Sequence, residues 1–237
     1  MNTQRVMQLT PELVAFCHRE VADPGPSQST QYLREEDFAP AATDLLARKG
    51  EGPFWLFAYG SLIWKPEIPH VDTRHATAFG WHRAFSMKIE RYRATKEQPG
   101  YMMCLNRGGQ CEGMVLRLPD ENHLAQMEKL LRREVSRKGG LESARWIDVE
   151  SEAGTVRALT FYAAPMQLEN HETDRPLSEI AYGLARACGH WGSGADYLYN
   201  TVSHLEALGI HDQGLWELQE QVAAEIESLH HVRKSQG

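Results

Sequence analysis

The middle of the chain is dominated by short apolar runs with the spacing of β-strands. The first run, residues 54–59, is apolar and rich in aromatic side chains, which is typical of a strand buried on both faces. Glycine and proline residues separate the runs, and Gly108-Gly109 is the clearest of these breaks. The other strand-like runs are residues 76–89, 101–105, 111–118, 144–149 and 155–162.

Helical spacing occupies both ends of the chain and interrupts the strands once. The predicted helices are a short one that starts at Thr10-Pro11 and ends before Asp23, then residues 38–49, 121–138, 177–188, 194–208 and 212–229. Strands first, one helix between them and helices last predict an α+β fold with a strongly curved or barrel-like sheet. We divide the chain into an N-terminal helical arm, residues 1–52, and a main domain, residues 53–230.

The helix predicted at residues 121–138 places a carboxylate among apolar side chains. At about 100° per residue, one apolar stripe contains Leu124, Met127, Leu131 and Val135. Glu134 falls inside the arc of this stripe, where a carboxylate is unfavourable unless it is paired or used, and where burial makes it a better base. The structural alternative is a glutamate at the edge of the stripe, paired with an arginine such as Arg137 or Arg83. Periodicity alone favours this alternative.

The first strand runs into the turn Tyr59-Gly60-Ser61-Leu62. A turn of this kind exposes backbone N–H groups that can hold a carboxylate or a developing oxyanion. Gly60 also allows a ligand to approach the backbone closely. Because Gly-Ser commonly follows a strand, this segment alone favours an ordinary strand-ending turn.

Composition and charge exclude several classes of protein. The 237 residues are 42% hydrophobic with a net charge of -7, which is ordinary for a globular protein. A pI near 5.9 and the lack of a long basic block argue against a nucleic-acid partner. No apolar run approaches the about 18–20 residues that cross a bilayer, and residues 1–11 lack the pattern of a secretory signal. Four scattered cysteines without C-x-x-C spacing indicate reduced thiols, so we expect a cytoplasmic protein without a membrane segment.

Motifs for metals, nucleotides and protein nucleophiles are missing from the sequence. The 11 histidines include no H-E-x-x-H pattern, so we expect no metal site and no cofactor. Gly108-Gly109 lacks the Lys-Ser or Lys-Thr of a P-loop, and Ser61 lacks both outer glycines of a nucleophile elbow. Cys104 and Cys111 lie in strand-like runs, where small core residues are expected rather than nucleophiles.

Several segments, taken in order, resemble the ChaC-type γ-glutamylcyclotransferases. No single segment is specific, but their order over roughly residues 54–222 is. The matching segments are Phe57-Ala58-Tyr59-Gly60-Ser61-Leu62-Ile63-Trp64, Phe79-Gly80-Trp81-His82-Arg83-Ala84-Phe85, Gly108-Gly109-Gln110-Cys111-Glu112-Gly113, Arg133-Glu134, Leu159-Thr160-Phe161-Tyr162, and Leu205-Glu206-Ala207-Leu208-Gly209-Ile210-His211-Asp212.

The resemblance implies a γ-glutamylcyclotransferase-like fold, a small mixed β-barrel with flanking helices. It also implies a carbon–nitrogen lyase that cleaves glutathione to 5-oxoproline and cysteinylglycine, with Glu134 as the general base. The residues that it assigns to substrate binding are Leu56, Phe57, Ala58, Tyr59, Gly60, Ser61 and Tyr162. Two features depart from the family. Ala58 stands where a glycine is usual, and residues 88–97 differ from the usual segment, in which we expect contacts to the leaving group.

The implied chemistry also explains why no catalytic serine or cysteine is needed. The α-amine of the substrate attacks its own γ-carbonyl, so the enzyme supplies a base and a polar backbone turn. Glu134 and the turn at Gly60 match these two needs together, which favours the functional interpretation of both. Two alternatives remain: a cyclotransferase for other γ-glutamyl peptides or amines, and a non-enzymatic regulatory partner of cation transport. A regulatory partner would have no need for a carboxylate such as Glu134 on the buried apolar stripe of a helix.

Overall fold

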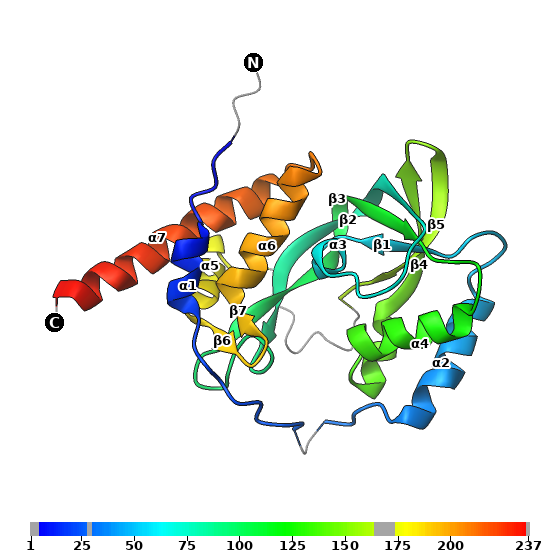
Figure 1. Ribbon diagram of the computed structural model, residues 1–237, viewed down its shortest axis with the longest axis horizontal. Coiled ribbons are helices and arrows are strands. Elements are labelled where there is room, and N and C mark those ends of the chain that lie inside the picture. The colour runs from blue at the N-terminus through cyan, green and yellow to red at the C-terminus, as the bar shows by residue number, and fades with distance from the viewer. Residues whose placement is uncertain (1–4, 28–29, 164–173, 236–237) are drawn as a thin grey trace. The chain divides into compact units, whose positions relative to one another are not determined.

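The computed structural model describes residues 5–27, 30–163 and 174–235 (Figure 1). The helices are α1 (Pro11–Cys17), α2 (Glu35–Ala47), α3 (Ser61–Trp64), α4 (His123–Glu134), the 3₁₀ helix η1 (Lys138–Ser143), α5 (Leu177–Arg186), α6 (Gly194–Ala207) and α7 (Gln213–Ser235). The strands are β1 (Trp55–Ala58), β2 (Asp72–Ile89), β3 (Gly100–Arg117), β4 (Ala144–Ser151), β5 (Gly154–Phe161), β6 (Cys188–Gly189) and β7 (Gly192–Ser193).

The chain forms two compact units, which we describe separately. The barrel unit comprises Pro26–Arg83 and Cys104–Glu169. The helical unit comprises Met1–Gly25, Ala84–Met103 and Asn170–Gly237. These units are defined by contacts between residues and leave untested the domain boundary that the sequence predicted at residues 52–53, which stays a prediction.

The five longer strands close into a barrel in the order β1-β3-β2-β4-β5. β1 pairs with β3 in antiparallel and with β5 in parallel orientation, so the barrel is mixed. β4 pairs with both β2 and β5 in antiparallel orientation. The prediction of an α+β fold with a barrel-like sheet is confirmed.

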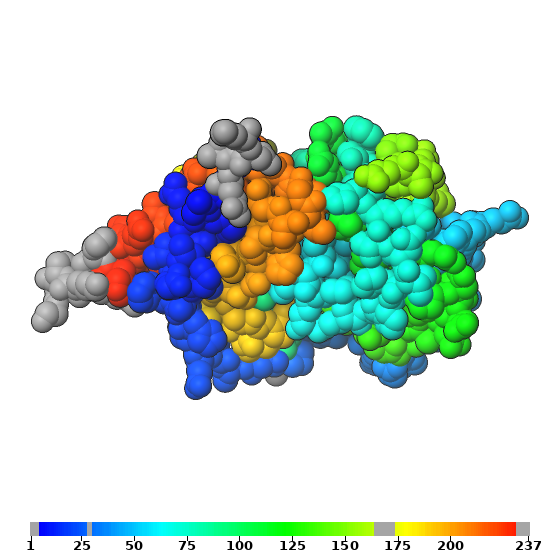
Figure 2. Space-filling model, turned by 45° about the horizontal axis from the view of Figure 1, so that its top comes forward, coloured from blue at the N-terminus to red at the C-terminus, as the bar shows by residue number. Residues whose placement is uncertain are grey.

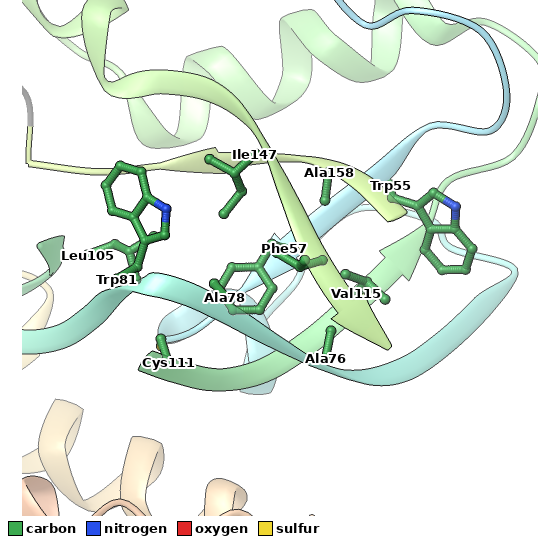
Figure 3. Packing of buried hydrophobic residues seen from close by; sticks show 11 residues of the cluster. Trp55, Phe57, Ala76, Ala78, Trp81, Leu105, Cys111, Val115, Ile147 and Ala158 are labelled. Atoms are coloured by element: carbon green, nitrogen blue, oxygen red, sulfur yellow. The ribbon is translucent and has the colours of Figure 1, made fainter. Parts of the chain in front are cut away.

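The barrel unit has its own hydrophobic core, shown in Figure 3. The buried residues of this cluster are Trp55, Phe57, Ala76, Ala78, Trp81, Leu105, Cys111, Val115, Ile147, Val149 and Ala158. Bulky rings from β1 and β2 meet branched aliphatic side chains from β3 and β4, with alanines between them, so large and small side chains fill the interior together. Tyr59 and Tyr162 pack against the same cluster while remaining partly exposed.

Helices α2 and α4 lie side by side in the barrel unit (Figure 1). Arg132 of α4 pairs with Glu35 of α2, and its guanidinium lies 4.9 Å from the ring centre of Phe38. The indole Nε1 of Trp146, on β4, donates to the backbone oxygen of Leu45 at 2.9 Å. These contacts attach both helices to the barrel and thereby fix the end of α4.

The helical unit packs α5, α6, α7 and α1 together, and Figure 2 shows α1 in blue against the orange and red helices. The helix start predicted at Thr10-Pro11 is confirmed, and α6 starts with a cap of the same kind. Thr10 Oγ1 accepts from the N–H of Leu13 at 3.4 Å, and Ser193 Oγ accepts from the N–H of Asp196 at 3.0 Å. Each hydroxyl satisfies one N–H that the first helical turn leaves without an intrahelical partner.

Two predicted boundaries are wrong. The runs predicted as separate strands at residues 101–105 and 111–118 belong to the single strand β3. Gly108 and Gly109 have positive φ angles of 98° and 69°. Glycine adopts this region readily because it has no Cβ, so the strand can continue through both residues. The turn was inferred from the two adjacent glycines. In the structure, residues 107–110 form an exposed stretch of β3 between buried residues on both sides.

The helix predicted at residues 121–138 is shorter than expected, because α4 ends at Glu134. Val135 is extended, with φ −126° and ψ 109°, and its N–H donates to the oxygen of Leu131 at 2.8 Å. The 3₁₀ helix η1 follows, and it contains Gly139 and Gly140, which come directly after the end of the predicted helix. α3 and the β6–β7 pair are too short to leave a periodic pattern, and the sequence did not predict them.

Candidate active site

The residues predicted to bind substrate begin in β1, whose four residues are all buried. Leu56, Phe57 and Ala58 are 0% exposed, so these side chains belong to the core. Because this fraction counts backbone and side chain together, these three residues present no surface to a ligand, and their role in substrate binding stays a prediction. The strand is held tightly against β3, since a Cβ on Gly113 would lie 2.4 Å from the backbone oxygen of Ala58.

The turn after β1 is fixed by a buried arginine. Tyr59 donates its hydroxyl to the backbone oxygen of Phe161 at 2.8 Å, and its own backbone oxygen accepts from Arg83 Nη1 at 2.7 Å. Arg83 is 7% exposed and also donates to the backbone oxygen of Glu112. The guanidinium therefore joins the turn to β3 and sets the direction in which the carbonyl of Tyr59 points.

The same turn continues directly into the short helix α3. The N–H of Ile63 donates to the oxygen of buried Gly60, and the N–H of Lys65 donates to the oxygen of Ser61, both at 2.8 Å. The first residues of a helix have no acceptor in the preceding turn, which leaves the N–H groups of Ser61 and Leu62 without intrahelical partners. The chain therefore does turn after β1, and the use of this turn to bind substrate stays a prediction.

Glu134 is the last residue of α4, where buried Met127, Leu130 and Leu131 face the barrel. Its side chain is 22% exposed, which places the carboxylate at the edge of the apolar stripe. Leu124 was predicted to belong to this stripe, and this prediction is wrong because Leu124 is 44% exposed.

The arginine partner of Glu134 also differs from the two that were considered. Arg133 Nε donates to Glu134 Oε1 at 2.8 Å, whereas Arg83 holds the backbone of the turn. Arg133 Nη1 also contacts Glu67 Oε2 at 2.9 Å. Glu67 follows α3 closely in the chain, so this arginine links the end of α4 to the segment that continues from the turn.

The pKa of Glu134 is raised above its ordinary value, chiefly because burial disfavours the charged carboxylate. The charge of Arg133 and its hydrogen bond lower the pKa, and the negative charge of Glu67 raises it, but burial is the largest effect. A carboxyl of this kind can accept and return a proton closer to neutral pH than an exposed glutamate can.

Tyr162 follows β5 and is partly exposed. Its N–H donates to the oxygen of Ser143 at 3.0 Å, and its ring meets that of Trp81 edge-on at 5.3 Å. The exposed guanidinium of Arg107 lies 4.0 Å from the Trp81 ring centre and 5.9 Å from that of Tyr162. Tyr162 and Tyr59 therefore both pack against the barrel core and remain partly exposed.

Sequence reasoning missed the roles of Arg83, Arg133 and Glu67. Arg83 and Arg133 stand in the segments that carry the family resemblance, which was the available signal. Glu67 gave no signal, because its contact with Arg133 depends on how the segment after α3 folds. In the described part of the chain, no three His, Cys, Asp or Glu side chains gather as a metal site would require. No described helix is both long and apolar enough to cross a membrane.

The fold defines the class of protein first. Two solved structures, described as gamma glutamyl cyclotransferase specific to glutathione from yeast, superpose with TM-scores of 0.66 and 0.62 at 20% and 19% identity. They cover 74% and 72% of this chain and 97% and 98% of their own chains. At this identity the likeness concerns the fold alone, and the fold is that of the γ-glutamylcyclotransferases.

Sequence comparison then gives the family. The family model described as ChaC-like protein matches residues 54–225, and the chain belongs to this family. A glutathione-specific gamma-glutamylcyclotransferase of Escherichia coli (strain K12) is 35% identical over 192 residues, which cover 81% of this chain and 82% of the relative. Gamma-glutamylcyclotransferase 2-3 of Arabidopsis thaliana is 28% identical, and the match covers 71% of this chain and 87% of that relative.

Proposed function

We propose that this protein cleaves glutathione by intramolecular cyclotransfer and releases 5-oxoproline and cysteinylglycine. The observation that carries the proposal is the carboxyl of Glu134, which is largely buried, has a raised pKa, and lies at the end of a helix attached to a γ-glutamylcyclotransferase barrel. The glutathione-specific relatives support the choice of substrate.

In the proposed reaction the substrate provides its own nucleophile. The α-amine attacks the γ-carbonyl carbon, a carbon–nitrogen bond closes the five-membered lactam, and the γ-amide bond to cysteine breaks. Attack within one well-oriented molecule can reach effective molarities of about 10⁵–10⁸ M. The main task of the protein is therefore to fold the glutamyl chain and to move one proton.

Glu134 is proposed to move that proton. A model α-amine has a pKa of about 7.7–8.0, and the raised pKa of Glu134 brings the carboxyl closer to this value. The carboxylate takes a proton from the attacking amine and returns it to the departing nitrogen of cysteine, so the enzyme ends the cycle unchanged.

The turn after β1 is proposed to hold the glutamyl group. The backbone N–H groups of Ser61 and Leu62 can donate to the α-carboxylate or to the oxygen that becomes negative during attack. Gly60 leaves room for the ligand beside them. Tyr59 and Tyr162 present partly exposed rings, which we assign to the substrate-binding surface.

The test is to incubate the purified protein with glutathione and to identify the products by chromatography and mass spectrometry. We expect equal amounts of 5-oxoproline and cysteinylglycine, at a rate that EDTA leaves unchanged. N-acetyl-glutathione is the matched control, because it keeps the γ-amide and lacks the nucleophilic amine.

Release of free glutamate, or cleavage of N-acetyl-glutathione at a comparable rate, would indicate hydrolysis and would overturn the proposal. Incorporation of ¹⁸O from labelled water gives the same distinction, since hydrolysis introduces water oxygen into glutamate and cyclisation introduces none into the lactam.

A further inference from the structure

Arg133 lies between two carboxylates that come from different elements. Its Nε donates to Glu134 Oε1 at 2.8 Å, and its Nη1 donates to Glu67 Oε2 at 2.9 Å. The side chains of Arg133 and Glu134 are 18% and 22% exposed, whereas Glu67 is 51% exposed. One planar guanidinium thus fixes a largely buried carboxylate on one side and a solvent-facing carboxylate on the other.

Glu67 adopts a backbone conformation that is uncommon for glutamate. Its φ angle is 51°, in the left-handed region where a side chain is disfavoured. Two cations hold its carboxylate, Lys65 Nζ at 3.2 Å and Arg133 at 2.9 Å. Strained positions persist where surrounding contacts determine them, and they concentrate at functional sites.

The contact with Arg133 opposes the role of Glu134 as a base. A neighbouring guanidinium stabilises the carboxylate and lowers its affinity for a proton. Burial has the larger effect on the pKa of Glu134 and raises it, and the charge of Glu67 raises it further. The second carboxylate therefore offsets part of the effect of Arg133 while Arg133 still orients Glu134.

We propose that Arg133 and Glu67 are positioning residues for Glu134, in which the guanidinium aims the carboxylate and Glu67 counters the guanidinium charge so that Glu134 remains available as a base. This inference rests on the function proposed above for Glu134. When Glu134 takes a proton its attraction to Arg133 weakens, and Glu67 keeps the guanidinium in place until the proton leaves.

A second arginine on the same helix provides a matched comparison. Arg132 also contacts two carboxylates, Glu35 of α2 and Glu128 one turn earlier, the latter at 2.9 Å. The pKa of Glu35 is lowered, chiefly by its hydrogen bond to Arg132, as expected of an ordinary exposed ion pair. Variants of the Arg132–Glu35 pair change the same kinds of charge, one on α4 and one on α2, at a site away from Glu134.

The first experiment titrates the Glu134 carboxyl by ¹³C NMR in the free protein, with the resonance assigned from Glu134→Gln. Glu67→Gln removes a charge that raises the pKa of Glu134, so this pKa should fall. Arg133→Met removes a charge that lowers it, so the pKa should rise. Arg132→Met and Glu35→Gln should leave it unchanged.

In the part of the chain that the structure describes, the charged groups that act on Glu134 are Arg133 and Glu67. The cations that act on Glu67 are Lys65, Arg133 and Lys129. Lys65→Met is therefore a further check, because it releases Glu67 on its other side and keeps the Arg133–Glu67 contact. It should move the titration of Glu134 less than Glu67→Gln does. An unchanged Glu134 titration in both Glu67→Gln and Arg133→Met overturns the proposal.

The second experiment measures how kcat/KM for glutathione depends on pH, since its acidic limb reports the essential base of the free enzyme. The limb should move to lower pH in Glu67→Gln and to higher pH in Arg133→Met. Arg133→Met should also lower kcat by about 10- to 100-fold, because the carboxylate is no longer aimed. Arg133→Lys should restore only part of this, since an ammonium cannot reproduce the guanidinium fork.

The two experiments separate the two claims. If the wild-type protein does not cleave glutathione, the proposed function fails, yet the NMR titration still tests the coupling of the three residues. If the protein is active and both variants lose rate equally without opposite shifts of the acidic limb, Arg133 and Glu67 serve the fold alone and the inference is wrong.

Discussion

The helical unit and the barrel unit both contain largely buried arginines paired with carboxylates, but the two carboxylates differ in their exposure to solvent. In the helical unit, Arg93 donates to Asp196 at 2.7 Å and to the backbone oxygen of Ser193 at 2.9 Å, at the start of α6. In the barrel unit, Arg133 contacts Glu134 at 2.8 Å. The pKa of Glu134 is raised above its ordinary value.

Hydration of the carboxylate distinguishes the two pairs. The side chain of Asp196 is 40% exposed, so water stabilises its charge together with Arg93. Glu134 is 22% exposed, and its loss of hydration outweighs the effect of Arg133. An ion pair therefore indicates a structural role where the carboxylate remains hydrated. Where the carboxylate has lost most of its hydration and is still paired, the ion pair marks a candidate catalytic base.

The largest effect is expected from Glu134→Gln, which tests whether the buried carboxylate acts as a base. The amide keeps the shape and cannot accept the proton, so turnover of glutathione should fall by about 10²–10⁴-fold while the substrate still binds. Steady-state kinetics with isothermal titration of glutathione measures both quantities. Glu128→Gln is the control, because it removes a carboxylate that pairs with Arg132 on the same helix. Turnover of Glu134→Gln within a few-fold of wild type would contradict the assignment of the base.

The second prediction concerns the structural pair of the helical unit. Arg93→Met should lower the free energy of unfolding by about 1–2 kcal/mol, since it removes hydrogen bonds to Ser193 and Asp196 and solvent already screens the carboxylate. Chemical denaturation measures this loss. Arg91→Met, which removes the more exposed contact with Asp23, should cost less.

Arg93→Met should also leave the pH dependence of kcat/KM unchanged, because no titrating base depends on this pair. A shifted acidic limb would break the distinction between the two units. A raised KM without that shift would support the contacts to the leaving group that the sequence led us to expect at residues 88–97, which remain a prediction.

Much of the fold could be predicted from the sequence because its elements are long and locally consistent. The buried strand β1 and the capped starts of α1 and α6 follow from side chains close together in the chain. The continuity of β3 could not be predicted, because Gly108 and Gly109 resemble a turn and continue the strand only when neighbouring strands pair with it. Local pattern fails where distant pairing overrides it.

The candidate site could be predicted only in part, for a related reason. Glu134 is visible because a carboxylate interrupts an apolar stripe, and the turn at Gly60 is visible because it ends a buried strand. The link from Arg133 to Glu67 was not predictable, since Glu67 lies 66 positions before Arg133 in the chain. Contacts between segments far apart in the chain leave no periodic signal.

The third prediction follows from the sign of the pKa shift. The pKa of Glu134 is raised above the ordinary value of a glutamate, so the folded state binds a proton more tightly than the unfolded state. The stability that this group contributes is complete below about pH 4.5 and is lost as the pH rises through the folded pKa.

Glu134→Gln removes this loss, so its melting temperature relative to that of wild type should increase from acidic to neutral pH. Differential scanning calorimetry of both proteins at several pH values measures the trend. Glu128→Gln provides the reference for losing another partly buried, arginine-paired carboxylate of the same helix, because the Glu128 side chain is 20% exposed. A relative melting temperature that falls with pH would mean that the paired carboxylate stabilises the fold, as the pairs of the helical unit do.

The smallest effect is expected from the thiols, which are distributed evenly between the two units. Cys17 and Cys188 belong to the helical unit, Cys104 and Cys111 to the barrel unit, and all four are free and buried. Burial raises the pKa of Cys17 to about 11, with a further contribution from Cys188, so at neutral pH about one molecule in 10⁴ carries this thiolate.

Because the proposed nucleophile is the substrate amine, brief treatment of the native protein with iodoacetamide should leave turnover unchanged, and mass spectrometry should find no labelled cysteine. Complete loss of activity together with labelling of Cys104 or Cys111 would place a protein nucleophile in the barrel unit, and the Cys104→Ala and Cys111→Ala variants would identify which thiol it is.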